Sequence, residues 1–243
     1  MSETYLDELL KPLIKTAWQL KLSKSKSAQA ATDSSKFGGL PYAESGDAWP
    51  SCPTCKNQLN FVAQLKHPTE KSLHTFFYCF DCFPWGSSKD ETGQWLVRSY
   101  SAANMTNYAA IAPALPNQYQ MAACNCTEHP VQVLPDYYDL GKVSPLADSL
   151  CEKIDDENSY DIYQAAVIRS GCLEDYATLI GGYPKWIQGE STKSCEICNS
   201  EMEFFAQLDS EDEADLMWGD CGAVYLFRCP QHKNEFALEL QCY

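Results

Sequence analysis

Apolar residues recur at every second position in two segments of the chain, residues 59–65 and 202–208. This is the period of a β-strand with one buried face, so both segments are predicted strands. Each is followed by apolar runs that we interpret as partner strands in antiparallel sheets. The predicted partners are residues 73–78, 95–100, 223–228 and 236–242.

Two other stretches have the apolar spacing of helices. Residues 4–20 place leucine, isoleucine, alanine and tryptophan on one face, with Pro12 either kinking this helix or standing in the first turn of a shorter one. Residues 144–170 predict further helix, and Ser144 before Pro145 is a favourable start. The polar residues 21–36 predict a flexible linker. Residues 101–136 contain four prolines and no clear period, which predicts irregular structure.

The chain repeats itself at an offset of 143 positions. Gly38-Gly39-Leu40-Pro41, Cys52-x-x-Cys55 and Phe61-Val-Ala-Gln-Leu65 recur as Gly181-Gly182-Tyr183-Pro184, Cys195-x-x-Cys198 and Phe204-Phe-Ala-Gln-Leu208. A match at constant offset indicates a duplicated structural unit.

We therefore predict an α+β, β-rich fold made of two duplicated antiparallel β halves that are related by a pseudo-twofold axis, with flanking helices. The predicted boundaries are an N-terminal helix and flexible linker over residues 1–35, a first β-rich repeat over 36–136, and a helical connection with the second repeat over 137–243.

Each half carries two closely spaced ligand pairs that suit a tetrahedral metal ion. Two residues between ligands allow one turn to hold both, and zinc in structural sites takes four cysteine or histidine ligands. Reduced core cysteines are the alternative, whereas a redox role is disfavoured because each pair has its own partner pair. We predict two closed, structural zinc ions, because the protein supplies all four ligands of each. The predicted ligands are Cys52, Cys55, Cys79 and Cys82 in the first half, and Cys195, Cys198, Cys229 and His232 in the second.

The remaining cysteines form weaker patterns. Cys124, Cys126 and His129 either bind a third metal, together with Cys151 or Cys172, or remain free thiols beside a solvated histidine. Cys221 and Cys242 have no partner pattern, and we expect them to be small core residues.

The charge of the chain limits its partners. With 33 acidic and 18 basic residues its net charge is -15, which repels nucleic acids and anionic membranes and favours basic proteins, or simply keeps the protein soluble. No apolar run approaches 18 residues, which excludes a membrane span. Asp7 and Glu8 stand where a signal peptide would be apolar, so we expect a cytoplasmic protein.

An acidic insertion distinguishes the second half. The offset between the halves grows from 143 to 150 at Cys229, which places seven additional residues after Leu208. As a calcium loop this segment is a poor match, because Ala214 stands where the sharp turn needs glycine. A solvated turn and a docking surface for basic proteins are the two interpretations. The predicted partner-binding residues are Asp209, Glu211, Asp212, Glu213, Asp215, Trp218 and Asp220.

Catalytic motifs are absent from the sequence. His67, His74 and His129 are not in a motif that pairs histidine with a nucleophile, and there is no phosphate-binding glycine loop or nucleophile elbow. We therefore name no catalytic residue and favour a non-enzymatic, zinc-stabilised protein-binding module. Two alternatives stay open: an enzyme with a cleft between the repeats, and a nucleic-acid binder using its zinc ribbons and Lys21, Lys24, Lys26 and Lys36.

Several segments carry a family resemblance over residues 36–243: Lys36-Phe-Gly-Gly-Leu-Pro41, Trp49-Pro50 and Phe61-Val-Ala-Gln64, then Gly182-Tyr-Pro-Lys-Trp186, Gln207-Leu-Asp-Ser210, Trp218-Gly-Asp-x-Gly222 and Tyr225-Leu-Phe227. On these residues the chain resembles the YwqG-like family, widespread bacterial proteins of unknown function. Many of its members lack cysteines at these positions.

The zinc-bearing version is similar to the eukaryotic programmed-cell-death-two proteins and to the yeast ribosome-assembly chaperone. These relatives share the paired glycines with the CxxC arrangement and act as chaperones for a basic ribosomal protein. The resemblance implies a duplicated β-rich fold and the binding of a basic client. The chain departs at Leu40-Pro41-Tyr42, where those relatives usually have tryptophan, so their own client is not implied.

Overall fold

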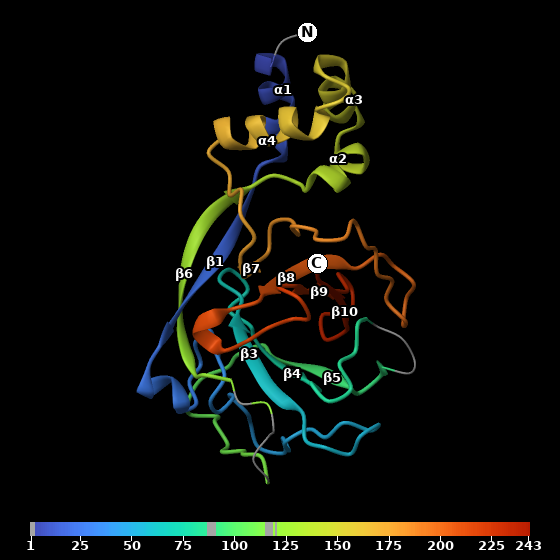
Figure 1. The fold of residues 1–243 in the computed structure, drawn as a ribbon. Coiled ribbons are helices and arrows are strands. Elements are labelled where there is room, and N and C mark those ends of the chain that lie inside the picture. Colours follow the sequence, from blue (N-terminus) through green and yellow to red (C-terminus); the bar gives the residue numbers. More distant parts are fainter. Residues whose placement is uncertain (1–2, 87–90, 115–118, 120) are drawn as a thin grey trace.

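The computed structural model describes residues 3–86, 91–114, 119 and 121–243. Its main element is one ten-stranded antiparallel sheet with the order β10-β9-β8-β7-β1-β6-β2-β3-β4-β5 (Figure 1). The strands are β1 (Lys15–Lys24), β2 (Lys36–Phe37), β3 (Asn60–Lys66), β4 (Leu73–Tyr78), β5 (Trp95–Tyr100), β6 (Cys124–Val133), β7 (Leu179–Ile180), β8 (Glu203–Asp209), β9 (Ala223–Arg228) and β10 (Phe236–Gln241).

Four α-helices form a separate layer at one end of the molecule, next to the ends of β1 and β6 (Figure 1). They enclose their own apolar cluster, which includes Leu10, Leu140, Leu150 and Tyr163. Among the described residues, no helix is long and apolar enough to cross a membrane. The α-helices are α1 (Glu3–Leu10), α2 (Tyr137–Val143), α3 (Pro145–Ile154) and α4 (Ser159–Arg169), and short 3-10 helices are η1 (Lys11–Leu13), η2 (Lys26–Gln29) and η4 (Asp212–Ala214).

The structure confirms the helices after Ser144 and corrects two other predictions. The helix predicted over residues 4–20 ends near Pro12, and β1 follows it into residues 21–24, which were predicted as linker. Residues 124–133, predicted as irregular, form β6. Both strands are stabilised by pairing with each other over ten residues, from Lys15↔Val133 to Lys24↔Cys124. Local periodicity does not report such distant pairing.

Two groups of four strands flank the central β1–β6 pair, β2–β5 on one side and β7–β10 on the other. The pair Phe37↔Ala63 in the first group and the pair Ile180↔Ala206 in the second have the same register at an offset of 143. A bulge interrupts β3 between Phe61 and Ala63 and β8 between Phe204 and Ala206, again at this offset. The two groups therefore share the same strand register and the same bulge position.

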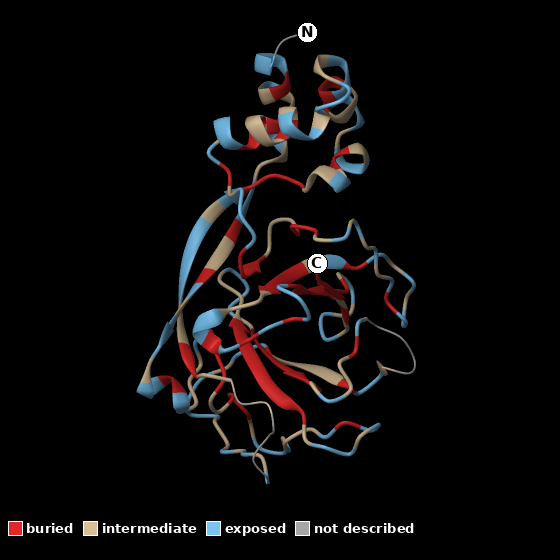
Figure 2. Cartoon of the chain, in the orientation of Figure 1, coloured by how far each residue is buried: buried red, intermediate tan, exposed pale blue. Residues whose placement is uncertain are grey.

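The sheet curls so strongly that its two ends approach each other. The N–H of Leu240 in β10 donates to the carbonyl of Trp85, which follows β4, at 2.7 Å. The largest apolar cluster accordingly combines both groups, for example Phe76 with Leu238. Trp218 is fully buried in this cluster, with its ring centre 5.0 Å from that of Tyr78. Figure 2 shows the buried residues concentrated on β3, β8 and β9, whereas much of β6 is exposed or half-buried.

Candidate metal centres and acidic groove

The first metal-ligand cluster lies at one end of the β3–β4 hairpin. Cys52 and Cys55 occupy a turn before β3, and Cys79 and Cys82 follow β4. Because β3 and β4 are paired, their adjoining turns meet. The Sγ atoms of Cys52 and Cys82 are 3.7 Å apart, and those of Cys55 and Cys79 are 3.5 Å apart.

The second cluster occupies the corresponding place on the β8–β9 hairpin. Cys195 and Cys198 precede β8, while Cys229 and His232 follow β9. The Sγ atoms of Cys198 and Cys229 are 3.7 Å apart, and the Nδ1 atom of His232 lies 3.7 Å from the sulfurs of both Cys195 and Cys229.

These distances fit a tetrahedral metal ion. Four sulfurs held at about 2.3 Å from a central ion are separated by about 3.8 Å, and a sulfur and an imidazole nitrogen by about 3.6 Å. A disulfide would require about 2.05 Å, and none of the cysteines is paired in that way. In each cluster all four ligand atoms lie within 4.8 Å of one another. All eight predicted ligands are thus brought together as two clusters that can each hold a metal ion.

The turns around the clusters direct backbone N–H groups at the sulfurs. The N–H of Cys82 donates to the Sγ of Cys79 at 3.4 Å, and that of His232 donates to the Sγ of Cys229 at 3.2 Å. Such bonds orient and stabilise thiolate ligands. In the second cluster, hydrogen bonds from the hydroxyl and the backbone N–H of Ser200 lower the pKa of Cys198 to about 6. In the first cluster burial opposes ionisation of Cys52, but backbone N–H groups outweigh it and lower its pKa to about 7.

Each cluster is part of a small apolar core that is separate from the largest one. The first includes Leu59 and Phe77, with the ring of Trp49 packed edge-on against Phe77 at 5.5 Å. The second includes Trp186, whose ring stacks on Phe227 at 6.1 Å. In both clusters the potential metal ligands thus lie within an apolar core at the end of a hairpin.

The weaker cysteine pattern does not form a third cluster among the described residues. Cys124 and Cys126 lie against the main core from β6, while His129 is exposed and its Nε2 lies 3.0 Å from the Thr127 hydroxyl. Cys151 and Cys172 belong to the separate helical cluster. Cys242 is buried, as predicted, but the prediction for Cys221 was wrong because this residue is exposed.

The acidic insertion lines a groove with a volume of about 390 Å³. Thr178, which directly precedes β7, holds two residues of the groove in place. The Thr178 hydroxyl accepts a hydrogen bond from the N–H of Asp209 and donates one to the carboxylate of Glu211. None of the ion pairs in the described part of the chain involves the four acidic side chains of the groove. The lining residues are Tyr176, Asp209, Ser210, Glu211, Asp212, Glu213, Met217, Cys221 and Tyr243.

Burial raises the pKa values of two of these carboxyl groups. It raises the pKa of Asp209 to about 6 and that of Glu211 to about 7. These two carboxyl groups therefore ionise between about pH 5 and 8.

Three of the predicted partner-binding residues are not part of the groove. Trp218 is fully buried, so the prediction that it contacts a partner is wrong: an aromatic ring at the centre of the core is inaccessible. Asp215 forms an ion pair with Lys24 at 3.3 Å. The backbone carbonyl of Asp220 accepts from the N–H of Tyr243, and its side chain does not line the groove.

The structure also reveals polar contacts between the two strand groups that no sequence motif indicated. The guanidinium of Arg228 on β9 binds both carboxylate oxygens of Glu70, at 2.6 and 2.7 Å. Close by, His74 on β4 packs edge-on against Phe205 of β8, with ring centres 4.8 Å apart. These residues are distant in sequence, and the curl of the sheet brings them together.

His74 also contacts two serines, an arrangement that catalytic sites use. Its Nε2 lies 2.9 Å from the Ser72 hydroxyl, and its Nδ1 lies 2.9 Å from the Ser99 hydroxyl. However, His74 is 2% exposed, and burial lowers its pKa to about 3. A neutral imidazole sealed from solvent and engaged at both nitrogens supports packing between the groups and does not act as a general base.

Residues 35–232 match the model of a protein family described as Domain of unknown function (DUF1963). The match spans most of the 243-residue chain, so the chain belongs to this family. No curated protein matches the chain.

Proposed function

We propose that this DUF1963 member is a non-enzymatic, zinc-stabilised module of the cytoplasm that binds a basic protein.

Zinc is the proposed ion in both clusters. Thiolate and imidazole ligands in a tetrahedron suit zinc, which has no geometric preference of its own, whereas calcium and magnesium require oxygen ligands. Cys52, Cys55, Cys79 and Cys82 would hold one ion, and Cys195, Cys198, Cys229 and His232 the other. With four protein ligands neither ion has an open position for substrate, so both would stabilise the fold.

Duplication with a pseudo-twofold axis is the proposed origin of the two strand groups. It is supported by the sequence repeat, by the mirrored strand order around β1 and β6, and by registers that agree at an offset of 143. We also propose that the chain is related to the YwqG-like proteins and to the programmed-cell-death-two chaperones, and that it chaperones its basic partner.

The acidic groove is the proposed surface for partner binding, and it is the main support for this function. Four carboxylates converge there without an ion-paired cation among the described residues, and Tyr176, Met217 and Tyr243 provide apolar contacts for the stems of long side chains. Lysine or arginine side chains of a partner match this combination of charge and apolar surface.

Fluorescence anisotropy with a labelled peptide rich in lysine and arginine tests this function. We expect binding that strengthens from pH 6 to pH 8 as Asp209 and Glu211 ionise. The double variant Asp212→Asn/Glu213→Gln should weaken it, while the surface variant Glu201→Gln, at a residue that does not line the groove, should not. Equal binding of a glutamate-rich peptide, or no binding of the basic peptide at all, would contradict the proposal.

A further inference from the structure

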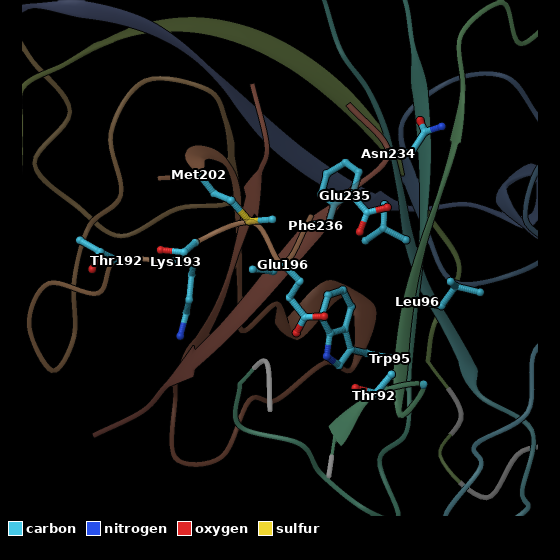
Figure 3. Close-up of a pocket in the computed structure, with 14 residues that line it drawn as sticks. Thr92, Trp95, Leu96, Thr192, Lys193, Glu196, Met202, Asn234, Glu235 and Phe236 are labelled. Atoms are coloured by element: carbon cyan, nitrogen blue, oxygen red, sulfur yellow. The ribbon is translucent and has the colours of Figure 1, made fainter. Parts of the chain in front are cut away.

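A second concave site lies between the two ends of the curled sheet. Its volume is about 530 Å³, within the range of about 300–1,000 Å³ that is typical of ligand sites. One wall is the edge strand β5, with Trp95, Leu96 and Val97, and the other includes the start of β10, with Phe236 and Ala237. In Figure 3, the labelled side chains come from both walls. We call this site the edge cleft.

The backbone of β5 faces the edge cleft with unused hydrogen-bonding groups. The N–H of Cys79 donates to the carbonyl of Gln94 at 2.9 Å, so Gln94 is in a hydrogen-bonded pair with the neighbouring strand β4. Such pairs alternate along an antiparallel ladder. Trp95 and Val97 therefore direct their N–H and C=O groups away from β4, and neither has a hydrogen-bond partner on that side among the described residues.

The facing strand β10 obeys the same alternation. The N–H of Cys229 donates to the carbonyl of Glu235 at 3.0 Å, which orients the N–H and C=O groups of Phe236 outward. Further along, the outward N–H of Leu240 already binds the carbonyl of Trp85. The sheet is thus closed at one end of β10 and open at the other, where the edge cleft lies.

The charges of the edge cleft favour a cationic occupant. Its two free carboxylates belong to Glu196, which is exposed, and Glu235, which is half-buried. Neither is part of an ion pair among the described residues, whereas the ammonium group of Lys193, the cation lining the cleft, is paired with Glu239. Apolar contacts from Trp95, Met202 and Phe236 complete a site that suits alternating apolar and basic side chains.

We propose that the edge cleft binds an extended, lysine- or arginine-containing segment of a partner protein as an additional β-strand paired with β5. Backbone pairing supplies affinity in this mode of recognition, while alternate side chains supply specificity. The two metal clusters flank the cleft, since Glu196 follows Cys195 and Gly93 packs against Pro53 in the turn of Cys52. Metal ions bound there would hold its walls in place. The inference rests on the proposed binding of basic proteins but assigns a different surface from the acidic groove.

Two peptides of identical charge separate strand pairing from simple attraction. The probe is a fluorescein-labelled octapeptide of alternating lysine and valine, and its control carries N-methyl groups on alternate backbone amides, which prevents pairing. We expect the control to bind at least about tenfold more weakly, equivalent to about 1.4 kcal/mol, because backbone hydrogen bonds are lost. In hydrogen–deuterium exchange, the probe should protect the Trp95 and Val97 amides, and the N-methylated control should not.

Variants of β5 provide the second arm. Val97→Pro removes an outward N–H that no described strand uses, and it should lower the affinity for the probe by about tenfold. Val97→Thr retains the N–H and should change the affinity by less than about twofold. Urea denaturation checks that both variants fold. If Val97→Pro does not fold, the two peptides and the exchange data on the unaltered protein still decide the question.

Other outcomes overturn the inference in distinguishable ways. Equal binding of the two octapeptides would reject the edge cleft. So would a result in which Asp212→Asn/Glu213→Gln no longer binds the probe while Val97→Pro binds it as tightly as the unaltered protein, and basic-protein binding would then remain at the acidic groove. Failure of every basic peptide to bind would reject the proposed function as well. Protection of the β5 amides that rises with protein concentration alone would identify a second copy of the chain as the occupant and also reject the inference.

Discussion

The ion pair between Glu70 and Arg228 is the most direct probe of how the two strand groups are held together. Glu70 precedes β4 and Arg228 ends β9, so the pair connects the first group with the second. The side chain of Arg228 is 9% exposed and that of Glu70 is 40% exposed. The guanidinium also lies 5.0 Å from the ring centre of Phe205, in a largely apolar environment.

We expect Glu70→Gln to lower the free energy of unfolding by about 2 kcal/mol. Breaking a fully buried pair costs about 3–5 kcal/mol, whereas an exposed pair contributes about 0.2–1 kcal/mol. Because solvent reaches Glu70 but hardly reaches Arg228, the expected cost lies between these limits. The measurement is urea denaturation followed by tryptophan fluorescence at neutral pH.

The pair Lys142–Glu201 supplies the matched control, since both of its side chains are at least half exposed, 50% and 64%. Glu201→Gln should cost less than about 0.5 kcal/mol. The pH dependence adds a second check: the neighbouring Arg228 lowers the pKa of Glu70 to about 2, so the contribution of the pair is complete above about pH 4.5 and is lost as the pH falls toward 2. Equal costs for the two variants would refute the account of this interface.

Two further variants test the core and the acidic groove. Trp218→Ala should lower the free energy of unfolding by about 3–5 kcal/mol in urea denaturation, because a fully buried ring at the junction of both groups leaves a cavity; a loss below about 1 kcal/mol would contradict that position. Burial raises the pKa of Glu211 to about 7, so the folded protein retains a proton that the unfolded chain releases near pH 4.5, and its stability falls as the pH rises from about 5 to 8. Glu211→Gln should reduce this fall in thermal unfolding, and an unchanged pH profile would contradict the shifted pKa.

The strands of the two hairpins were predictable from local runs of apolar residues, although β3, β4 and β9 are buried on both faces and not on one face as the alternation in residues 59–65 predicted. The predicted bounds of β4, β5 and β9 agree with the structure at Leu73–Tyr78, Trp95–Tyr100 and Ala223–Arg228. The grouping of the eight metal ligands was also predictable, since each ligand pair adjoins a strand whose partner carries the other pair. Two-residue spacing and hairpin pairing together determine the clusters.

The central ribbon could not be predicted, for a physical reason. β6 includes Pro130 and is largely exposed, so it has neither an apolar period nor a favourable composition. It forms because β1 pairs with it throughout, and Pro130 is tolerated because only β1 borders β6 there. The position of Trp218 escaped prediction in the same way: its acidic neighbours suggest a surface loop, but the curl of the sheet encloses the ring.

Metal content measured by native mass spectrometry tests the central claim of two zinc-closed hairpins. The protein should carry two zinc ions per chain, Cys52→Ser and Cys195→Ser should each retain one, and Cys124→Ser, which alters a buried cysteine outside the clusters, should retain both. A protein that folds with no metal, or that loses no ion when Cys52 or Cys195 is replaced, would contradict the account.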